Sequence, residues 1–220
     1  MTYAELLASV ASILVVDTTD SDLLAFFPRI IETAELRCYR EVDFLATRKA
    51  ATATLTQGTY TMAGPSDWLV GRHMYATPQS GAATRITLLR REESFLSEYW
   101  PTRATQGVPK YWSEPTIGQL QIVPTANAAF TLEMAYTYRP AALSVTNTSS
   151  WLSANVPDML MYAAFVTAAG YAKNYGMRSD DPQQAVSWEQ SYQQAKASAV
   201  MEELRRKVTD PTPAQNPATA

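Results

Sequence analysis

Residues 129–138 read Ala-Phe-Thr-Leu-Glu-Met-Ala-Tyr-Thr-Tyr, and this stretch decides the fold class. Large apolar or aromatic side chains alternate with small or polar ones along its whole length. Side chains of a β-strand point to opposite faces at every second residue. One face then holds Phe130, Leu132, Met134, Tyr136 and Tyr138. The stretch therefore predicts a half-buried antiparallel strand with an aromatic-rich side.

The residues before this strand also favour extended structure. Residues 51–56 and 59–62 alternate and are rich in threonine, and Gln57-Gly58 between them has the composition of a hairpin turn. Residues 92–99 instead predict a short helix that ends before Pro101, because a proline disfavours helical geometry in the residue before it. Further strands are predicted at residues 68–75, 85–89, 109–114 and 119–123.

The N-terminal part of the chain shows helical periodicity. Residues 2–14 predict a first helix, and a short helical turn is expected to reach Phe27. Between Pro28 and Leu45, apolar residues recur at three- and four-residue steps, which is typical of an amphipathic helix. We expect Pro28 at the first position of that helix, because an N–H at this position would have no hydrogen-bond partner within the helix.

The C-terminal part is also helical in pattern. A helix from Pro157 to Tyr175 contains many small residues, Gly170 among them, which predicts close approach by a neighbouring helix. Asp181 is expected to cap the last helix, which then runs to about Val208.

Together these patterns predict an α+β protein. N- and C-terminal helices are expected to form an antiparallel helical bundle, with an inserted antiparallel β-rich region and an extended C-terminal tail. The predicted parts are residues 1–48, 49–140, 141–208 and 209–220. The last of these contains three prolines and no large apolar residue, so alone it is expected to be extended and flexible.

The composition limits the classes of function. Of 220 residues, 46% are apolar, which is enough for a substantial core. The net charge is −3, whereas a protein that binds nucleic acid by counterion release normally has a basic surplus. A slightly acidic wall could still line a channel through which DNA slides. The apolar segment 5–16 is too short to span a bilayer and lacks preceding basic residues, so we expect a soluble protein without a signal peptide and without a membrane partner.

Residues that could carry chemistry are few. His73 is the sole histidine, which excludes a site with several histidine ligands. Cys38 is the sole cysteine and is expected to be a small buried residue on a helix. Helix capping explains the acidic pairs 92–93 and 180–181, and there is no glycine-rich phosphate loop. We therefore predict no catalytic, cofactor-binding or metal-binding residues and no enzymatic activity.

Aromatic residues are frequent, with five tryptophans and twelve tyrosines. Trp68, Trp100 and Trp112 lie in the β-rich region, where an ordinary core would account for most of them. Tryptophan is nevertheless enriched at protein interfaces. These three residues are therefore candidates for contacts between subunits, and a sugar-stacking platform is the alternative.

Seven stretches, none of which is a chemical motif, occur in a characteristic order and spacing between about residues 20 and 205. They are residues 27–37, 65–69, 109–112, 120–124, 136–140, 143–152 and 157–164. In this order the chain resembles the head-to-tail adaptor, or connector, family of tailed bacteriophages.

The resemblance implies a structural role. Such adaptors form rings, usually of twelve copies, that dock beneath the portal protein, offer a platform to tail or nozzle proteins, and continue the channel through which DNA leaves. DNA would pass without sequence-specific binding. The protein would be assembled in the bacterial cytoplasm and reside at the head-tail junction of the virion.

The resemblance also implies that the C-terminal segment, residues 205–220 here, reaches toward the portal. The candidate portal-contacting residues are Arg205, Arg206, Lys207, Pro211, Pro213 and Pro217. Three alternatives stay open: another neck or tail-completion protein of the virion, a carbohydrate-binding module, and a hydrolase with an unrecognised site.

Overall fold

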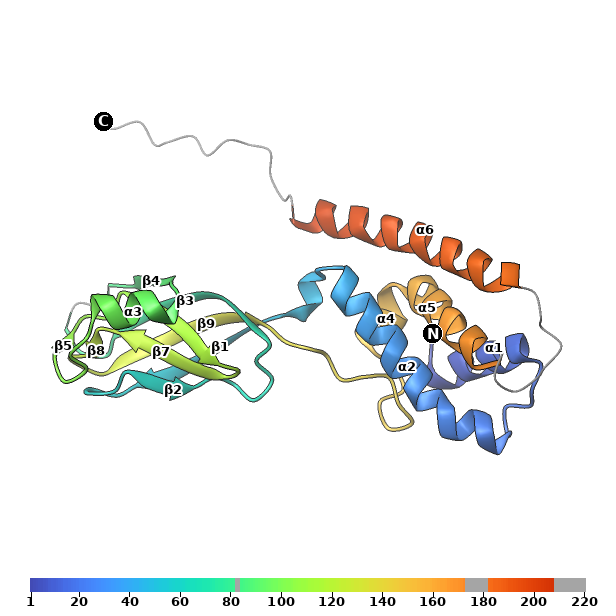
Figure 1. The fold of residues 1–220 in the computed structure, drawn as a ribbon, viewed down its shortest axis with the longest axis horizontal. Helices are drawn as coiled ribbons and strands as arrows, with labels where there is room; N and C mark the ends of the chain where they lie inside the picture. Colours follow the sequence, from blue (N-terminus) through green and yellow to red (C-terminus); the bar gives the residue numbers. More distant parts are fainter. Residues whose placement is uncertain (82–83, 173–181, 208–220) are drawn as a thin grey trace. The chain divides into compact units, whose positions relative to one another are not determined.

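The computed structural model describes residues 1–81, 84–172 and 182–207. The chain divides into two compact units (Figure 1). Met1–Ala46 and Pro140–Ala220 form one, called the helical unit below. Thr47–Arg139 form the other, called the sheet unit. Each unit has a hydrophobic core of its own.

Five helices build the described part of the helical unit, and local capping explains where the first two begin. The Thr2 side chain accepts a hydrogen bond from the Glu5 N–H, and the Glu5 carboxylate accepts one from the Thr2 N–H, so the two residues form a capping box. Asp20 accepts from two N–H groups of the second helix. The helices are α1 (Tyr3–Leu14), α2 (Ser21–Glu41), α4 (Trp151–Asn155), α5 (Pro157–Ala172) and α6 (Pro182–Lys207).

One local prediction for these helices is wrong. Pro28 lies inside α2 and does not begin it, because the Asp20 cap starts the helix at Ser21. Pro28 is exposed, so water can hydrate the carbonyl that its ring leaves without a partner. Three of the small residues of α5, namely Ala163, Ala164 and Ala168, are completely buried in the helical core, whereas a Cβ added at Gly170 would meet nothing within 4 Å. The predicted cap at Asp181 falls outside the described residues.

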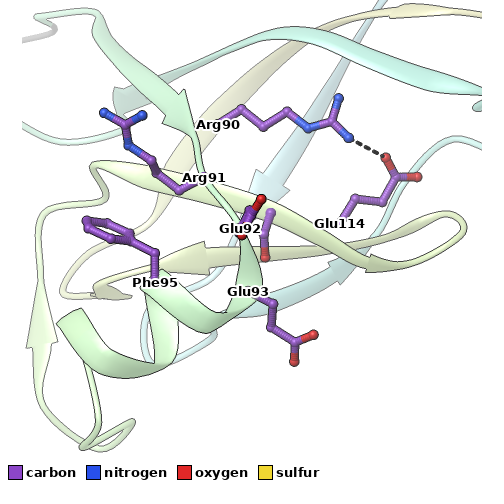
Figure 2. Close-up of a pocket in the computed structure, with 7 residues that line it drawn as sticks. Arg90, Arg91, Glu92, Glu93, Phe95 and Glu114 are labelled. Atoms are coloured by element: carbon purple, nitrogen blue, oxygen red, sulfur yellow. Dashed lines mark ion pairs between the residues drawn. The ribbon is translucent and has the colours of Figure 1, made fainter.

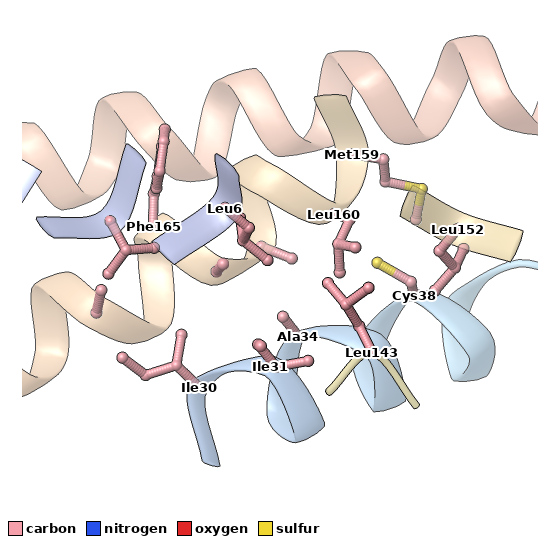
Figure 3. Packing of buried hydrophobic residues seen from close by; sticks show 14 of the residues in the cluster. Leu6, Ile30, Ile31, Ala34, Cys38, Leu143, Leu152, Met159, Leu160 and Phe165 are labelled. Atoms are coloured by element: carbon pink, nitrogen blue, oxygen red, sulfur yellow. The ribbon is translucent and has the colours of Figure 1, made fainter. Parts of the chain in front are cut away.

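The core of the helical unit forms around α5, which packs against α1, α2, α4 and α6 (Figure 3). Helix α5 is apolar on most of its surface, as expected for a helix surrounded by others. Cys38 of α2 is completely buried in this core, which confirms the expectation for it. Figure 3 shows Leu6, Ile31, Leu143 and Leu160 among the buried side chains of this core.

The sheet unit contains nine strands and one helix among its described residues. They are β1 (Arg48–Leu55), β2 (Thr61–Ala63), β3 (Val70–Pro78), β4 (Ile86–Arg90), α3 (Glu93–Tyr99), β5 (Gln106–Gly107), β6 (Tyr111–Thr116), β7 (Gln119–Val123), β8 (Thr125–Ala126) and β9 (Phe130–Thr137). A single-turn 3-10 helix, Leu45–Thr47, lies where the chain passes between the units.

Strand β9 is the stretch that decided the fold class, and the prediction for it is confirmed. Its residues alternate strictly between buried and half-buried positions. It pairs antiparallel with β1 on one side and with β3 on the other. The order of the seven-stranded sheet is β1-β9-β3-β4-β6-β7-β2, and β5 with β8 forms a separate pair.

The large sheet is nearly barrel-shaped. Its two edge strands, β1 and β2, are joined by residues 56–60 alone, so the sheet must curl until its first and last strands approach each other. The predicted hairpin across Gln57-Gly58 is wrong, because β1 pairs with β9 while β2 pairs with β7. The Gly58 N–H donates instead to the Ala126 carbonyl over 2.8 Å.

The predicted fold class, an antiparallel helical bundle with an inserted antiparallel β-rich region, is therefore wrong. The chain is a mixed α+β protein with a large, nearly closed sheet that has its own core. Two of its strand pairings, β4 with β6 and β5 with β8, are parallel. Parallel neighbours need a crossover connection, and α3 supplies it between β4 and β6. The alternation of apolar and polar residues along a strand indicates which side chains share a face of the sheet, but it does not indicate which strands pair with it.

Candidate interaction surfaces

The residues considered for chemistry do not form a reactive centre. Within residues 1–81, 84–172 and 182–207, no three histidine, cysteine, aspartate or glutamate side chains are grouped to hold a metal ion. His73 lies exposed on β3 of the sheet unit. Burial raises the pKa of the Cys38 thiol to about 12, with a smaller contribution from Glu41. The thiol therefore stays protonated at neutral pH and is a poor nucleophile.

The described helices also include none with both the length and the hydropathy to cross a bilayer.

Two of the three candidate tryptophans, Trp68 and Trp112, are buried in the core of the sheet unit. Trp68 and Trp112 are only 6% and 1% exposed, and their rings meet edge to face with centroids 6.3 Å apart. Trp68 also stacks on Tyr136 at 5.1 Å, and its indole N–H donates to the Glu114 carboxylate over 2.9 Å. In this conformation neither ring is available to stack on a sugar or to contact another subunit.

Gly71 makes this aromatic core fit. A Cβ at Gly71 would lie 2.5 Å from the rings of both Trp68 and Trp112, closer than atoms can approach. The glycine sits on β3 at a β-bulge opposite β9. Trp100, the third candidate, is half-buried and donates from its indole N–H to the Thr105 carbonyl over 2.8 Å.

An aromatic patch that the sequence analysis did not single out lies on the surface beside Trp100. It consists of Leu89, Phe95, Tyr99 and Tyr111. The Phe95 and Tyr99 rings are stacked at 5.8 Å, and each meets the edge of Tyr111. Leu89 pairs with Tyr111 across β4 and β6 and is 50% exposed.

The position of the patch on α3 was visible in the sequence. Phe95 and Tyr99 are four residues apart in the predicted helix, so they share one of its faces. An aromatic pair at a spacing of four residues in a predicted helix is a sequence signal for such a patch, and selecting tryptophans alone does not detect it.

A hollow of about 890 Å³ adjoins the patch (Figure 2). It is lined by Arg90, Arg91, Glu92, Glu93, Phe95, Ser113 and Glu114. The Arg90 guanidinium lies 3.7 Å from the Glu114 carboxylate, while Arg91 turns toward the Phe95 ring. Two arginines and three glutamates line the hollow, and such a mixture of charges suits the side chains of another protein better than a phosphate group.

At the other end of the chain, the last turn of α6 is fastened to the segment that leads out of the helical unit. The buried Glu203 carboxylate accepts a hydrogen bond of 2.9 Å from the Leu45 N–H. It also receives one of 2.7 Å from Arg206. The Lys207 ammonium reaches the carbonyl and the carboxylate of Asp43.

The candidate portal residues therefore differ in their surroundings. Arg206 and Lys207 take part in these intrachain contacts. Arg205 is exposed and has no ion-pair partner among the residues that the structure describes. Pro211, Pro213 and Pro217 lie outside those residues.

Charge is distributed unequally between the two units. The helical unit has nine basic and fifteen acidic residues, a net charge of −6. The sheet unit has nine basic and six acidic residues, a net charge of +3. The acidic surplus of the chain therefore lies in the helical unit.

The surface features of the described residues are thus an exposed aromatic patch, a hollow lined by charges of both signs, and an α6 end held by intrachain contacts. The comparison with known families gives the class of protein. The chain belongs to the SU10 adaptor protein family, whose model matches residues 1–217. This is a family of bacteriophage adaptors, and the chain is accordingly a structural protein of the virion that interacts with other virion proteins. No curated protein matches the chain.

Proposed function

We propose that this adaptor is a subunit of the head-to-tail connector. Copies form a ring, with twelve expected, that docks on the portal protein, carries the tail or nozzle proteins, and continues the DNA exit channel. The observation that supports this most is the family match, which spans both units and most of the segment after α6.

The charge pattern fits a channel through which DNA moves. Stable DNA binding requires several cations aimed at phosphates. Here most cations of the sheet unit are engaged with side chains of the same unit. Lys49 pairs with Asp67, Arg85 with Glu133, and Arg90 with Glu114. With a net charge of −3 for the whole chain, the wall of such a channel would not hold the DNA back.

Attachment to the portal is assigned to residues 205–220. The contacts of Glu203 and Lys207 hold the last turn of α6 in place, so the segment that follows starts from a fixed point. The composition of residues 209–220, with three prolines and no large apolar residue, suits a segment that wraps around a partner.

Native mass spectrometry of the full chain mixed with purified portal rings tests the proposal. We expect a complex in which one portal ring carries a fixed, integral number of adaptor copies, about twelve. Portal rings that stay free of adaptor at micromolar concentrations of both proteins would contradict it. A neck or tail-completion protein would instead bind isolated tail components and leave the portal free.

Removal of residues 209–220 tests the assignment of the tail. The melting temperature should change by less than about 1 °C, because the deleted segment lies beyond the α6 contacts. Portal affinity should fall at least about tenfold, equivalent to about 1.4 kcal/mol. A pull-down with unchanged portal binding would remove the tail from the mechanism.

Arg205 and Arg206 provide matched substitutions for the same assay. Arg205→Ala should weaken portal binding without a change in melting temperature, since Arg205 makes no described ion pair. Arg206→Ala should lower the melting temperature, because Glu203 is buried and loses a hydrogen-bond donor.

A further inference from the structure

We infer that neighbouring copies of this chain meet through two uncharged helix faces: the outer face of α6 on one copy and the outer face of α1 on the next. The inference rests on the proposed ring and names the surfaces that close it.

Helix α6 has two different sides. Its inner side packs into the helical unit through Tyr192, Ala195, Ala199 and Glu203. Its outer side is exposed and carries no charge over about 27 Å, at 1.5 Å per residue. The residues of this α6 face are Val186, Ser187, Gln190, Gln193, Gln194, Ala197, Ser198, Met201 and Leu204. Among them Val186, Met201 and Leu204 are each close to half exposed.

Two charged residues of α6, Glu189 and Lys196, are turned toward α2. The Arg37 guanidinium binds both oxygens of Glu189, at 2.6 and 2.9 Å. The Lys196 ammonium lies 2.8 Å from the Glu41 carboxylate. Arg37 and Glu41 are themselves paired at 2.9 Å. The intrachain network therefore uses Glu189 and Lys196 along one edge of α6. The exposed Arg205 follows the uncharged α6 face at its C-terminal end.

Helix α1 presents a second uncharged face, formed by Ala4, Ala8, Ser12 and Val15. Glu5 is the one charged residue beside it. The Glu5 carboxylate folds back to accept the Thr2 N–H over 2.8 Å, as part of the capping box. The exposed side of α2, by contrast, carries Asp22, Arg29, Glu32 and Arg40.

Val15 at the end of this α1 face is an independent sign of a contact. It adopts the left-handed conformation, with φ +57°, and its side chain is 84% exposed. Glycine is usual at this position after a helix, and a β-branched residue is strained there. Folding of the single chain gains nothing from a large apolar side chain that is both strained and in water. A neighbouring copy that covers Val15 would gain from it.

In the proposed ring, a second copy is the occupant of both faces, and the charge of the helical unit fits this choice of faces. The helical unit has a net charge of −6, so copies approach most favourably where neither surface presents a charge. Both helices pack against α5, and each directs its uncharged face away from α5. Two different faces of one unit provide the heterologous contact from which closed rings are built.

Charge substitutions on the two faces test the pairing. Assembly of the full chain on purified portal rings is followed by native mass spectrometry as adaptor concentration is raised. Ala197→Glu on α6 and Ala8→Lys on α1 should each raise the concentration for half-maximal loading at least about tenfold. A chain with both substitutions brings an added lysine and an added glutamate to the same junction, and should load within about threefold of the wild type. Failure of the double substitution to restore loading overturns the α1–α6 pairing.

Ala25→Glu on the exposed side of α2 is the matched control and should load as the wild type does. If wild-type chain does not load portal rings at all, the proposed function fails. If the wild type loads and Ala197→Glu loads like Ala25→Glu, the proposed function stands and this inference is overturned.

Val15→Gly separates contact from folding. Glycine relieves the left-handed strain, so the melting temperature should rise by about 2–4 °C. Loading of the portal should nevertheless become at least about threefold weaker. A variant that is more stable and loads as well as the wild type would overturn the role of Val15.

Discussion

The helical unit and the sheet unit are stabilised in different ways. In the helical unit, two carboxylates are buried beside the apolar core. Glu35 accepts hydrogen bonds from the Leu143 N–H and the Ser150 hydroxyl, and Glu203 accepts one from the Leu45 N–H. Each carboxylate fastens a connecting segment to a helix. The helical unit is therefore held by directional contacts in addition to apolar burial.

The core of the sheet unit depends on shape. Trp68, Trp112 and Tyr136 fill it, and the missing side chain of Gly71 leaves the room they need. Lys49 with Asp67 and Arg85 with Glu133 form ion pairs at its surface. The comparison teaches that a change of volume should damage the sheet unit most, whereas a change of hydrogen-bonding partner should damage the helical unit most.

The largest effect is expected for Gly71→Ala. The added Cβ would overlap both tryptophan rings, so the rings or the strand must move, and the sheet unit should lose about 3 kcal/mol or more of unfolding free energy. Urea unfolding followed by tryptophan fluorescence measures the loss. Gly170→Ala is the matched control in the helical unit, where the Cβ meets nothing, and it should stabilise α5 by about 0.5–1 kcal/mol. Equal effects of the two substitutions would contradict the steric account.

Next in size is Glu35→Ala. It leaves the buried Leu143 N–H and Ser150 hydroxyl without their acceptor, so about 2–3 kcal/mol should be lost. Thermal unfolding monitored by the helical circular dichroism signal reports this loss. A cost below about 0.5 kcal/mol would mean that these donors find water or another acceptor.

A smaller, pH-dependent effect is expected from the same carboxyl. Burial raises the pKa of Glu35 above its ordinary value, although the hydrogen bonds from Ser150 and Leu143 oppose this. The folded state therefore binds the proton more tightly than the unfolded state, and stability decreases as pH rises through the folded pKa. Relative to Glu35→Gln, the wild type should gain stability as pH falls from 7 toward about 4.5. Unfolding free energies of both proteins across that range give the difference, and a constant difference would refute the raised pKa.

The smallest effect is expected for Lys49→Ala, which removes a surface pair with Asp67 in the sheet unit. Exposed pairs of this kind add little, and salt screens what they add. Chemical unfolding should show no difference from the wild type beyond experimental error at physiological salt. A clear loss would show that charge contributes to the sheet unit more than its aromatic core suggests.

Elements with a strong local period could be predicted from the sequence. The alternation of residues 129–138 located β9, and the positions of α3 and β7 followed from equally local signals. The pairing of strands could not be predicted in the same way. Nothing near Gln57-Gly58 shows that β1 joins β9 while β2 joins β7, because those partners lie far along the chain. The predicted bundle failed for this reason, since the size and closure of the sheet depend on pairing.

The candidate surfaces show the same limit. Trp68 and Trp112 were candidates because tryptophan is enriched at interfaces. Both are buried in the core, where the missing side chain of Gly71 leaves room for their rings. The faces used for the assembly proposal were missed, because their signal is an absence of charge along one side of a helix. That signal becomes readable only when contacts such as Arg37 with Glu189 show where the charges of α6 are used.

The most direct test of the central claim is electron microscopy of purified portal rings incubated with the full-length chain. The account predicts one closed ring of adaptor copies, coaxial with the portal and in contact with it, in which each copy meets two neighbours. Portals without added density, or with scattered single copies and no closed ring, would contradict it.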